Sequence, residues 1–194
     1  MVKTLREFYG DASSQNPDLG RMINDRHFQR VAALIDKARV LTGGQTDAGQ
    51  RYIAPTLLKD ISMDDAIMQE EIFGPVLPML TYQSLEELIG NLKKLPEYPL
   101  ALYLFTSSDQ VERQVLDSTQ FGGGCINNTV MHVANPNLPF GGVGESGMGA
   151  YHGKNSFDAF SHKRSILKAT TLFDIKFRYA PYKDKVNMLK KMIK

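Results

Sequence analysis

The chain has 194 residues, of which 42% are apolar and 23% are charged, and its formal net charge is +2. This length and composition are typical of one globular domain with its own core, and they argue against two full domains. Because the charge is nearly balanced and no strongly basic stripe occurs, the sequence gives no reason to expect a nucleic-acid partner.

The single cysteine, Cys125, excludes an intrachain disulfide and a zinc site built on several cysteines. No apolar run is long enough for a membrane span, and the stretch MVKTLREFYG lacks the apolar centre of a signal peptide. The basic stretch KDKVNMLKKMIK, 183–194, fits an amphipathic terminal helix better than a membrane-binding patch. We therefore expect a cytoplasmic protein with no membrane partner.

Hydrophobic spacing predicts alternating helices and strands in the first half of the chain. Apolar residues recur at helical spacing after Asn24, which predicts an amphipathic helix over 25–39. The apolar runs YIAPTLL, 52–58, and VLPMLTY, 76–82, predict strands. The sequence SLEE, 84–87, is a capping box that opens a helix with leucine and isoleucine on one face.

The second half continues the alternation and then changes character. The run ALYLFT, 101–106, predicts a central strand covered by helices on both faces. A helix from Asp109, with Val111, Val115 and Leu116 inward, leads to a short strand at CIN, 125–127. Residues 128–155 show no period and predict a long loop, either ordered or mobile, and long loops in compact domains are usually functional. Late strands are expected in SILKAT, 165–170, and IKFRYAPY, 175–182.

This order of elements predicts the fold class. Strands that alternate with helices are typical of an α/β fold with an open, mostly parallel sheet and flanking helices. We expect this fold here, followed by a C-terminal strand tail.

Three motifs in the glycine-rich stretch resemble known sites without matching them. Gly142 to Gly147 satisfies G-x-G-x-x-G, but the preceding NPNLPF is no strand, so a tight structural loop is favoured over a phosphate site. Ser146 lies in GESGM, where Met148 replaces the glycine that a hydrolase elbow needs. The four histidines show no metal-ligand spacing, so we expect no metal site.

Cys125 and His132 are the other candidate pair. They are seven residues apart and would suit a thiolate and imidazolium, as in cysteine hydrolases. A lone cysteine beginning an apolar strand is more often a small buried side chain. A cysteine hydrolase or acyltransferase that uses Cys125 and His132 stays open as an alternative function.

Two adjacent acids open the stretch EEIFGPV, 70–76. Adjacent residues of an extended segment point to opposite faces, so they do not share one substrate by default. One of Glu70 and Glu71 is therefore expected to be a bystander.

EEIFGPV together with LPFGGVGESGMGAYHG, 138–153, strongly resembles the aldehyde dehydrogenase superfamily, particularly its class 3 branch. Four further blocks are similar to the family in its order and spacing: DLGRMINDRHFQRV, RYIAPTLL, PLALYLFT and SFDAFSHKRSIL. The resemblance implies a partial catalytic domain over 1–162 and an oligomerisation strand and tail over 163–194.

The resemblance also implies roles for individual residues. Glu71 corresponds to the family's ligand of the nicotinamide ribose of NAD or NADP, and Phe73 to the aromatic residue at the nicotinamide, with Glu70 as a neighbour. A carboxylate can accept hydrogen bonds from two ribose hydroxyls, and a phenyl ring supplies a flat apolar wall. Residues placed near the aldehyde tunnel or its rim are Asn127, Met131, His132 and Phe140.

The family's G-Q-x-C nucleophile motif and its glutamate base do not occur in these 194 residues. Cys125 is not at the position of the family's nucleophile. The resemblance thus implies the C-terminal part of an NAD(P)-dependent enzyme that oxidises small aldehydes to carboxylic acids. We expect this part to be inactive alone and the intact enzyme to be a homodimer. A non-catalytic interaction module that keeps the fold is a further alternative.

Overall fold

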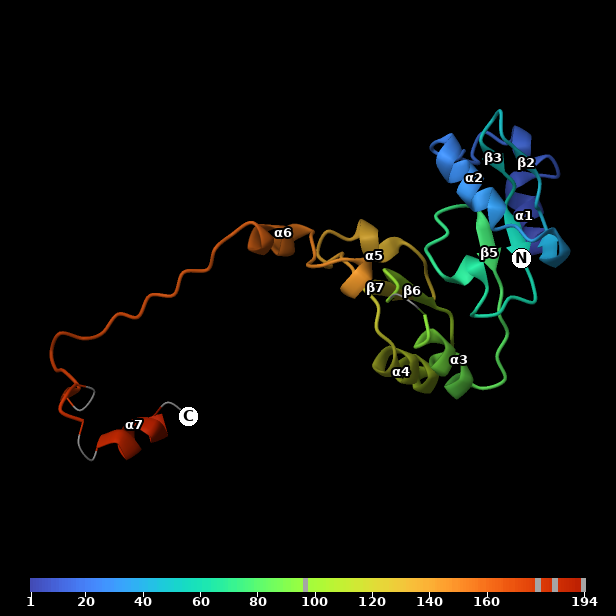
Figure 1. Ribbon diagram of the computed structural model, residues 1–194. Coiled ribbons are helices and arrows are strands. Elements are labelled where there is room, and N and C mark those ends of the chain that lie inside the picture. Colours follow the sequence, from blue (N-terminus) through green and yellow to red (C-terminus); the bar gives the residue numbers. More distant parts are fainter. Residues whose placement is uncertain (96–97, 177–178, 183–184, 193–194) are drawn as a thin grey trace. The chain divides into compact units, whose positions relative to one another are not determined.

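A computed structural model describes residues 1–95, 98–176, 179–182 and 185–192 (Figure 1). The chain forms two units, Met1–Ala159 and Phe160–Lys194. The elements of the first unit are α1 Val2–Tyr9, η1 Ser13–Gln15, α2 Asp25–Ala33, η2 Lys37–Arg39, β1 Val40–Thr42, β2 Thr46–Asp47, β3 Tyr52–Ile53, β4 Thr56–Leu58, η3 Ala66–Met68, β5 Val76–Pro78, α3 Leu85–Leu92, β6 Ala101–Leu104, α4 Asp109–Ser118, β7 Gly123–Ile126, α5 Met131–Ala134, η4 Gly144–Ser146 and α6 Gly153–Ala159.

The α/β class with open sheets is confirmed. In the described part of the chain, the sheets have the orders β1-β4-β5, β2-β3 and β6-β7. The two longest pairings, β4 with β5 and β6 with β7, are parallel. Antiparallel pairings join β1 to β4 and β2 to β3.

Helix α2 begins where the sequence predicts and ends earlier. The Asn24 side chain accepts a hydrogen bond from the His27 N–H at 2.9 Å, which caps the first turn. The predicted extension to residue 39 is wrong, because Asp36 accepts a hydrogen bond from the Ala38 N–H at 3.0 Å and starts η2 instead. Between them, Leu34 and Ile35 donate to carbonyls only three residues back.

Both predicted strands in the first half of the chain are shorter than expected. The run 52–58 forms two strands, β3 and β4, because Pro55 lies between them and has no N–H to donate. β5 ends at Pro78 rather than at residue 82, because its partner strand β4 ends at Leu58, whose carbonyl accepts the last bond, from the Met79 N–H at 2.9 Å.

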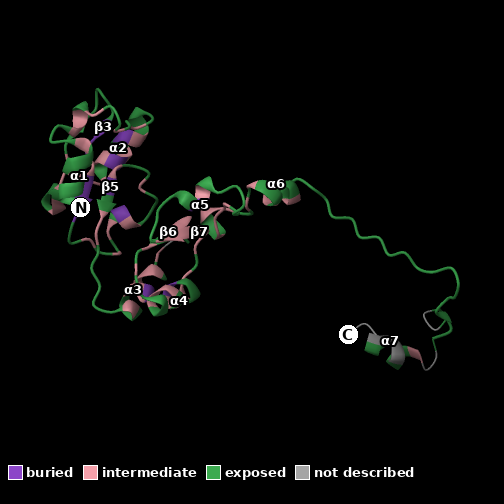
Figure 2. Ribbon diagram, turned by 180° about the vertical axis from the view of Figure 1, so that it is seen from behind, coloured by how far each residue is buried: buried purple, intermediate pink, exposed green. Residues whose placement is uncertain are grey.

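The main core lies between α2 and the β1-β4-β5 sheet. Its buried members are Phe28, Val31, Ile53, Leu58, Ile67 and Val76. Figure 2 shows this concentration of buried residues around α2, β3 and β5. Full burial of one such side chain contributes about 1.5–3 kcal/mol, so this cluster is the chief source of stability for this part of the chain.

After helix α3 the chain forms a strand-helix-strand unit, which consists of β6, α4 and β7. The start of α3 is capped by side chains. The Ser84 side chain accepts from the Glu87 N–H at 3.2 Å, while the Glu87 carboxylate accepts from the Gln83 N–H at 2.7 Å. β6 and β7 then pair in parallel from Ala101↔Gly123 to Leu104↔Ile126.

Two expectations for this unit are wrong. β6 is not a central strand covered on both faces, because it pairs with β7 alone in the described residues, and Tyr103 is 39% exposed. Leu116 of α4 is exposed rather than inward, whereas Val115 is buried. Apolar composition predicted burial, but burial needs a second layer that the described residues do not supply.

Residues 128–155 form the ordered kind of loop, with short helices in it. They contain α5, η4 and the start of α6, and the backbones of Phe140 and Tyr151 exchange two hydrogen bonds of 3.0 Å. The Ser146 hydroxyl accepts from the Val143 N–H at 2.9 Å and closes the turn of the GVGES stretch. These elements are short and lie among many glycines, so no hydrophobic period in the sequence reveals them.

The second unit contains helix α7, Val186–Met192, which confirms the helix expected in 183–194. No strand is assigned to 165–170 within the described part of this unit. A strand exists only where another strand pairs with it, so composition alone does not form one. The strand expected at 175–182 includes residues 177 and 178, which lie outside the described residues.

Candidate functional site

The stretch 69–75 forms the loop between η3 and β5, and it exposes both residues matched to the cofactor. Glu71 is exposed, and Phe73 is 76% exposed. Phe73 also has φ of 49°, a left-handed conformation that costs a non-glycine residue energy. Such strain persists only where the surroundings enforce it, so the contacts of this loop are informative.

Arg30 of α2 holds the first half of the loop. Its guanidinium donates to Glu70 Oε1 at 2.8 Å, to the carbonyl of Glu71 at 3.3 Å and to the carbonyl of Ile72 at 2.6 Å. Glu70, the acid expected to be a neighbour of the cofactor contact, forms an ion pair with Arg30. Glu71 contacts Arg30 through its backbone and leaves its carboxylate exposed.

Gly74 and Pro75 hold the second half of the loop. A Cβ at Gly74 would lie 2.8 Å from Val31 Cγ1, so a larger residue has no room against α2. The Pro75 carbonyl accepts from the Thr56 N–H at 2.8 Å at the start of the β4–β5 pairing. The loop is thus anchored to the helix and to the sheet.

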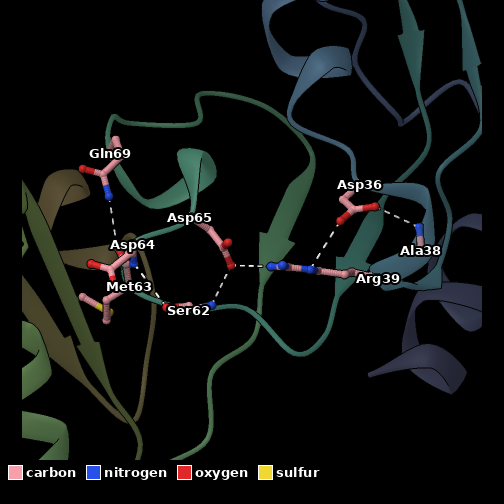
Figure 3. A network of polar contacts seen from close by, with 8 residues as sticks. All are labelled: Asp36, Ala38, Arg39, Ser62, Met63, Asp64, Asp65 and Gln69. Carbon is pink, nitrogen blue, oxygen red and sulfur yellow. Dashed lines mark hydrogen bonds and ion pairs between the residues drawn. The ribbon is translucent and has the colours of Figure 1, made fainter.

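A second polar network fixes the turn that leads into this loop (Figure 3). Arg39 forms an ion pair with Asp65 and another with Asp36 at 3.3 Å. The Ser62 N–H donates to Asp65 at 2.7 Å, and this bond, aided by Arg39, lowers the pKa of Asp65. The Gln69 side chain donates to the Met63 carbonyl at 3.0 Å.

Asn127 lies just after β7, at the carboxyl ends of the parallel pair. Its amide accepts from the Thr106 N–H at 2.9 Å and donates to the Thr106 carbonyl at 2.8 Å. The amide therefore ties the ends of β6 and β7 together. Carboxyl ends of parallel strands are where open α/β sheets bind ligands.

His132 of α5 is buried, with 5% of its surface exposed. Its Nδ1 lies 3.6 Å from Cys125 Sγ, so the fold brings together the pair considered for a cysteine hydrolase. Its Nε2 has no hydrogen-bond partner in the part of the chain that the structure describes. In the hydrolase signature a third group orients the histidine ring, and the described residues supply no such hydrogen-bond partner for His132.

The other two residues matched to the tunnel differ in exposure. Met131 is 57% exposed, while Phe140 is half-buried among aromatic rings. The Phe140 ring centroid lies 5.8 Å from that of His132 and 6.1 Å from that of His152. These rings form one apolar cluster beside α5.

A cleft of about 650 Å³ is lined by residues of both EEIFGPV, 70–76, and the glycine-rich stretch 138–153. Glu70 and Glu71 line it from one side, and Glu145 and Ser146 line it from the glycine-rich loop. Tyr98 also lines this cleft. Sequence reasoning missed Tyr98 and Glu145 as members of the site, because no spacing relates them to residue 71.

The described residues also bear on metal binding and membrane crossing. Within them, no group of three or more histidine, cysteine, aspartate or glutamate side chains could hold a metal ion. Nor does any helix in that part combine the length and apolar character that crossing a membrane requires.

Comparisons with known proteins agree on one family. The model of the aldehyde dehydrogenase family matches residues 1–166. The 4,4'-diaponeurosporen-aldehyde dehydrogenase of Staphylococcus aureus is 50% identical over 100% of this chain and 42% of its own length. The dimeric NADP-preferring aldehyde dehydrogenase of Rattus norvegicus is 50% identical over 93% of this chain and 40% of its own length.

A solved structure gives the same result for the fold. The structure described as the substrate-bound state of Staphylococcus aureus AldH has a TM-score of 0.88 and 49% sequence identity, and covers 100% of this chain and 42% of its own. The chain thus spans about two fifths of the length of these relatives. The match over residues 1–166 exceeds half of the chain, and the chain belongs to the aldehyde dehydrogenase family.

Proposed function

We propose that this chain supplies the nicotinamide-ribose contact and part of the aldehyde tunnel of an NAD(P)-dependent aldehyde dehydrogenase. The observation that carries this proposal is the loop 69–75, which is anchored on both sides and presents an exposed carboxylate and an exposed phenyl ring. When bound, NAD or NADP supplies the acceptor for the hydride that leaves the aldehyde.

The chemistry of the two exposed side chains fits a nicotinamide riboside. The Glu71 carboxylate is an acceptor with no donor of its own, which suits a pair of ribose hydroxyls. Phe73 offers an apolar face two residues away and stays in a strained conformation that its neighbours enforce. Together they orient the ribose and exclude water from one side of it.

The residues proposed for the tunnel have two roles: one holds the strand ends in place, and the others contribute to the tunnel wall. Asn127 fixes the ends of β6 and β7 through Thr106, so its role is to hold the floor of the tunnel. Met131 and Phe140 supply apolar surface beside it, and the buried His132 packs against the Phe140 ring, with the ring centroids 5.8 Å apart. This surface suits the organic part of an aldehyde rather than a charged substrate.

We further propose a partial catalytic domain over 1–162 and an oligomerisation strand and tail over 163–194. The name of the rat relative, a dimeric NADP-preferring enzyme, supports a homodimer and NADP among the cofactors. We also propose that the enzyme is cytoplasmic and that it converts small aldehydes to carboxylic acids.

The chain by itself is expected not to oxidise aldehydes, because the family's nucleophile and base motifs do not occur in it. The test is formation of NADH or NADPH from an aromatic aldehyde by the purified chain, by the amino-terminal portion of the Staphylococcus aureus relative, and by the two co-expressed. Turnover with both portions and with neither alone supports the proposal. Turnover by the chain alone that Cys125→Ser abolishes would overturn it.

One observation favours a second function, the cysteine hydrolase or acyltransferase. Cys125 Sγ and His132 Nδ1 are 3.6 Å apart. Iodoacetamide labelling across pH separates the two functions. If His132 activates the Cys125 thiol, Cys125 is labelled faster near neutral pH in the original chain than in His132→Gln. Equal rates in both proteins exclude the hydrolase.

A further inference from the structure

The guanidinium of Arg30 serves three acceptors in the loop that carries Glu71. Nη1 donates to the Glu70 carboxylate and to the Glu71 carbonyl, and Nη2 donates to the Ile72 carbonyl. These acceptors lie 40 to 42 residues from Arg30 in sequence, so the contacts are tertiary. We infer that Arg30 and Glu70 are positioning residues that hold Glu71 in the conformation that binds the cofactor ribose. This inference rests on the proposed function.

The acceptors explain why the position needs arginine. A guanidinium is a planar fork with five donors, so one side chain can bond three acceptors at fixed angles. A lysine ammonium is a point charge on a flexible stem and cannot hold the same geometry. The two carbonyls are the part of the contact that sets the backbone of the loop.

Glu70 acts on the loop through Arg30. Its carboxylate lies 2.8 Å from Nη1 and fixes the orientation of the guanidinium, which then bonds the backbone of the next two residues. The two adjacent acids therefore have separate tasks. Glu70 orients the arginine, and Glu71 keeps its carboxylate exposed for a ligand.

Helix α2 secures the loop at two consecutive positions. Arg30 bonds residues 70 to 72, and the buried side chain of Val31 leaves no room for a Cβ at Gly74. Phe73 lies between these anchors with φ of 49°. Loss of the arginine contacts releases one anchor, so the strained Phe73 is expected to relax and Glu71 to move with it.

A purely structural role would have a different signature. The side chains of Arg30 and Glu70 are 27% and 54% exposed, and ion pairs this exposed add little to global stability. We therefore expect the loop and cofactor binding to respond while the unfolding midpoint stays near that of the original chain.

The first arm of the test needs no cofactor. Amide hydrogen exchange of the 194-residue chain is measured for the original sequence, Arg30→Gln, Arg30→Lys and Glu70→Gln. Exchange in residues 70–74 is expected to accelerate most in Arg30→Gln. The matched control is Arg51→Gln, because Arg51 also donates to a carbonyl, that of Ile23 at 2.9 Å, and lies 3.8 Å from a carboxylate. Unchanged exchange in Arg30→Gln would overturn the inference.

The second arm uses the chain co-expressed with the amino-terminal portion of the Staphylococcus aureus relative. Arg30→Gln is expected to raise the KM for NAD or NADP about ten-fold, the loss of charge-assisted hydrogen bonds, with a smaller change in kcat. Arg30→Lys keeps the ion pair with Glu70 but cannot form the two carbonyl bonds at once. Its KM is therefore expected to lie between those of the original chain and Arg30→Gln. Arg51→Gln leaves both constants unchanged.

The double variant Arg30→Gln with Glu70→Gln tests the order of action. If Glu70 works through Arg30, the second substitution adds nothing to the first. Additive effects on KM would mean that Glu70 contacts the cofactor itself, and they would overturn its positioning role.

Glu71→Gln separates failure of this inference from failure of the proposed function. If Glu71→Gln raises the KM for the cofactor and Arg30→Gln does not, the inference alone is wrong. If Glu71→Gln has no effect, the proposed ribose contact is wrong, whatever hydrogen exchange shows for Arg30.

Discussion

Gly74 lies so close to Val31 that a Cβ on the glycine would be 2.8 Å from Val31 Cγ1. The contact joins the end of the EEIFG stretch to the buried face of α2. It places the residue before Pro75 in a position that no side chain fits, and it fixes the turn on which Glu71 and Phe73 are presented.

Gly74→Ala is expected to destabilise the first unit. The added methyl group must displace Val31, which is fully buried, and overpacking of this kind costs about 1–3 kcal/mol. Urea denaturation followed by circular dichroism measures the change. The matched control is Gly90→Ala in α3, where nothing lies within 4 Å of an added Cβ. That substitution is expected to stabilise the helix by about 0.5–1 kcal/mol, and equal losses from both would contradict the packing argument.

Phe73→Gly is expected to separate stability from cofactor binding. Glycine adopts the left-handed conformation without a Cβ penalty, and the exposed ring contributes little burial, so stability changes by less than about 1 kcal/mol. The KM for NAD or NADP is expected to rise, because the apolar wall is lost. Phe73→Ala, which removes the ring and keeps a Cβ, should raise the KM equally and be the less stable of the two. A KM unchanged in both would remove Phe73 from the proposed site.

Asn127→Ala is expected to loosen the joint between β6 and β7. It removes both side-chain hydrogen bonds to Thr106, each worth about 0.5–1.5 kcal/mol, at a residue with φ of 54°. Asn127→Gly loses the same bonds without left-handed strain, so it isolates their contribution in urea denaturation. Asn128→Ala serves as the control, since the Asn128 side chain accepts a local hydrogen bond from the next residue, the Thr129 N–H, at 2.7 Å. A loss in Asn128→Ala as large as in Asn127→Gly would contradict a specific role for Thr106.

Asp65 is expected to make stability depend on acid pH. Its folded-state pKa is lowered by the Ser62 N–H bond and by Arg39, so the ionised carboxylate favours the folded chain. Its contribution is present above the unfolded pKa of about 4 and is lost as pH falls through the lower folded pKa. The difference in unfolding free energy between the original chain and Asp65→Asn should therefore shrink below pH about 4. Arg39→Gln should reduce this dependence without abolishing it, because the Ser62 bond remains. A difference that stays constant with pH would contradict the assignment.

Local signals made parts of the fold predictable. The start of α2 follows from the Asn24 cap, and the start of α3 follows from Ser84, because both caps act within three residues. The end of α2 was missed because Asp36 offers a competing cap that the helical spacing does not reveal. β6 was expected to be covered on both faces because apolar composition does not report how many layers surround a strand.

The site was predictable where motif and function coincide and not where distant residues meet. Glu71 and Phe73 were identified from the resemblance of EEIFGPV to the family. Their roles at the cofactor remain predictions. Arg30 gives no sequence signal, since its partners are 40 to 42 residues away. Tyr98 and Glu145 line the same cleft although 47 residues separate them in the sequence, so no local pattern relates them.

The most direct test of the account is the KM for NAD or NADP of Glu71→Gln in the co-expressed assembly, compared with Glu70→Gln. Replacing the exposed carboxylate with a neutral amide weakens the proposed bonds to both ribose hydroxyls, so we expect a rise of about ten-fold or more, larger than for Glu70→Gln. A KM for Glu71→Gln equal to that of the original chain would contradict the proposed ribose contact.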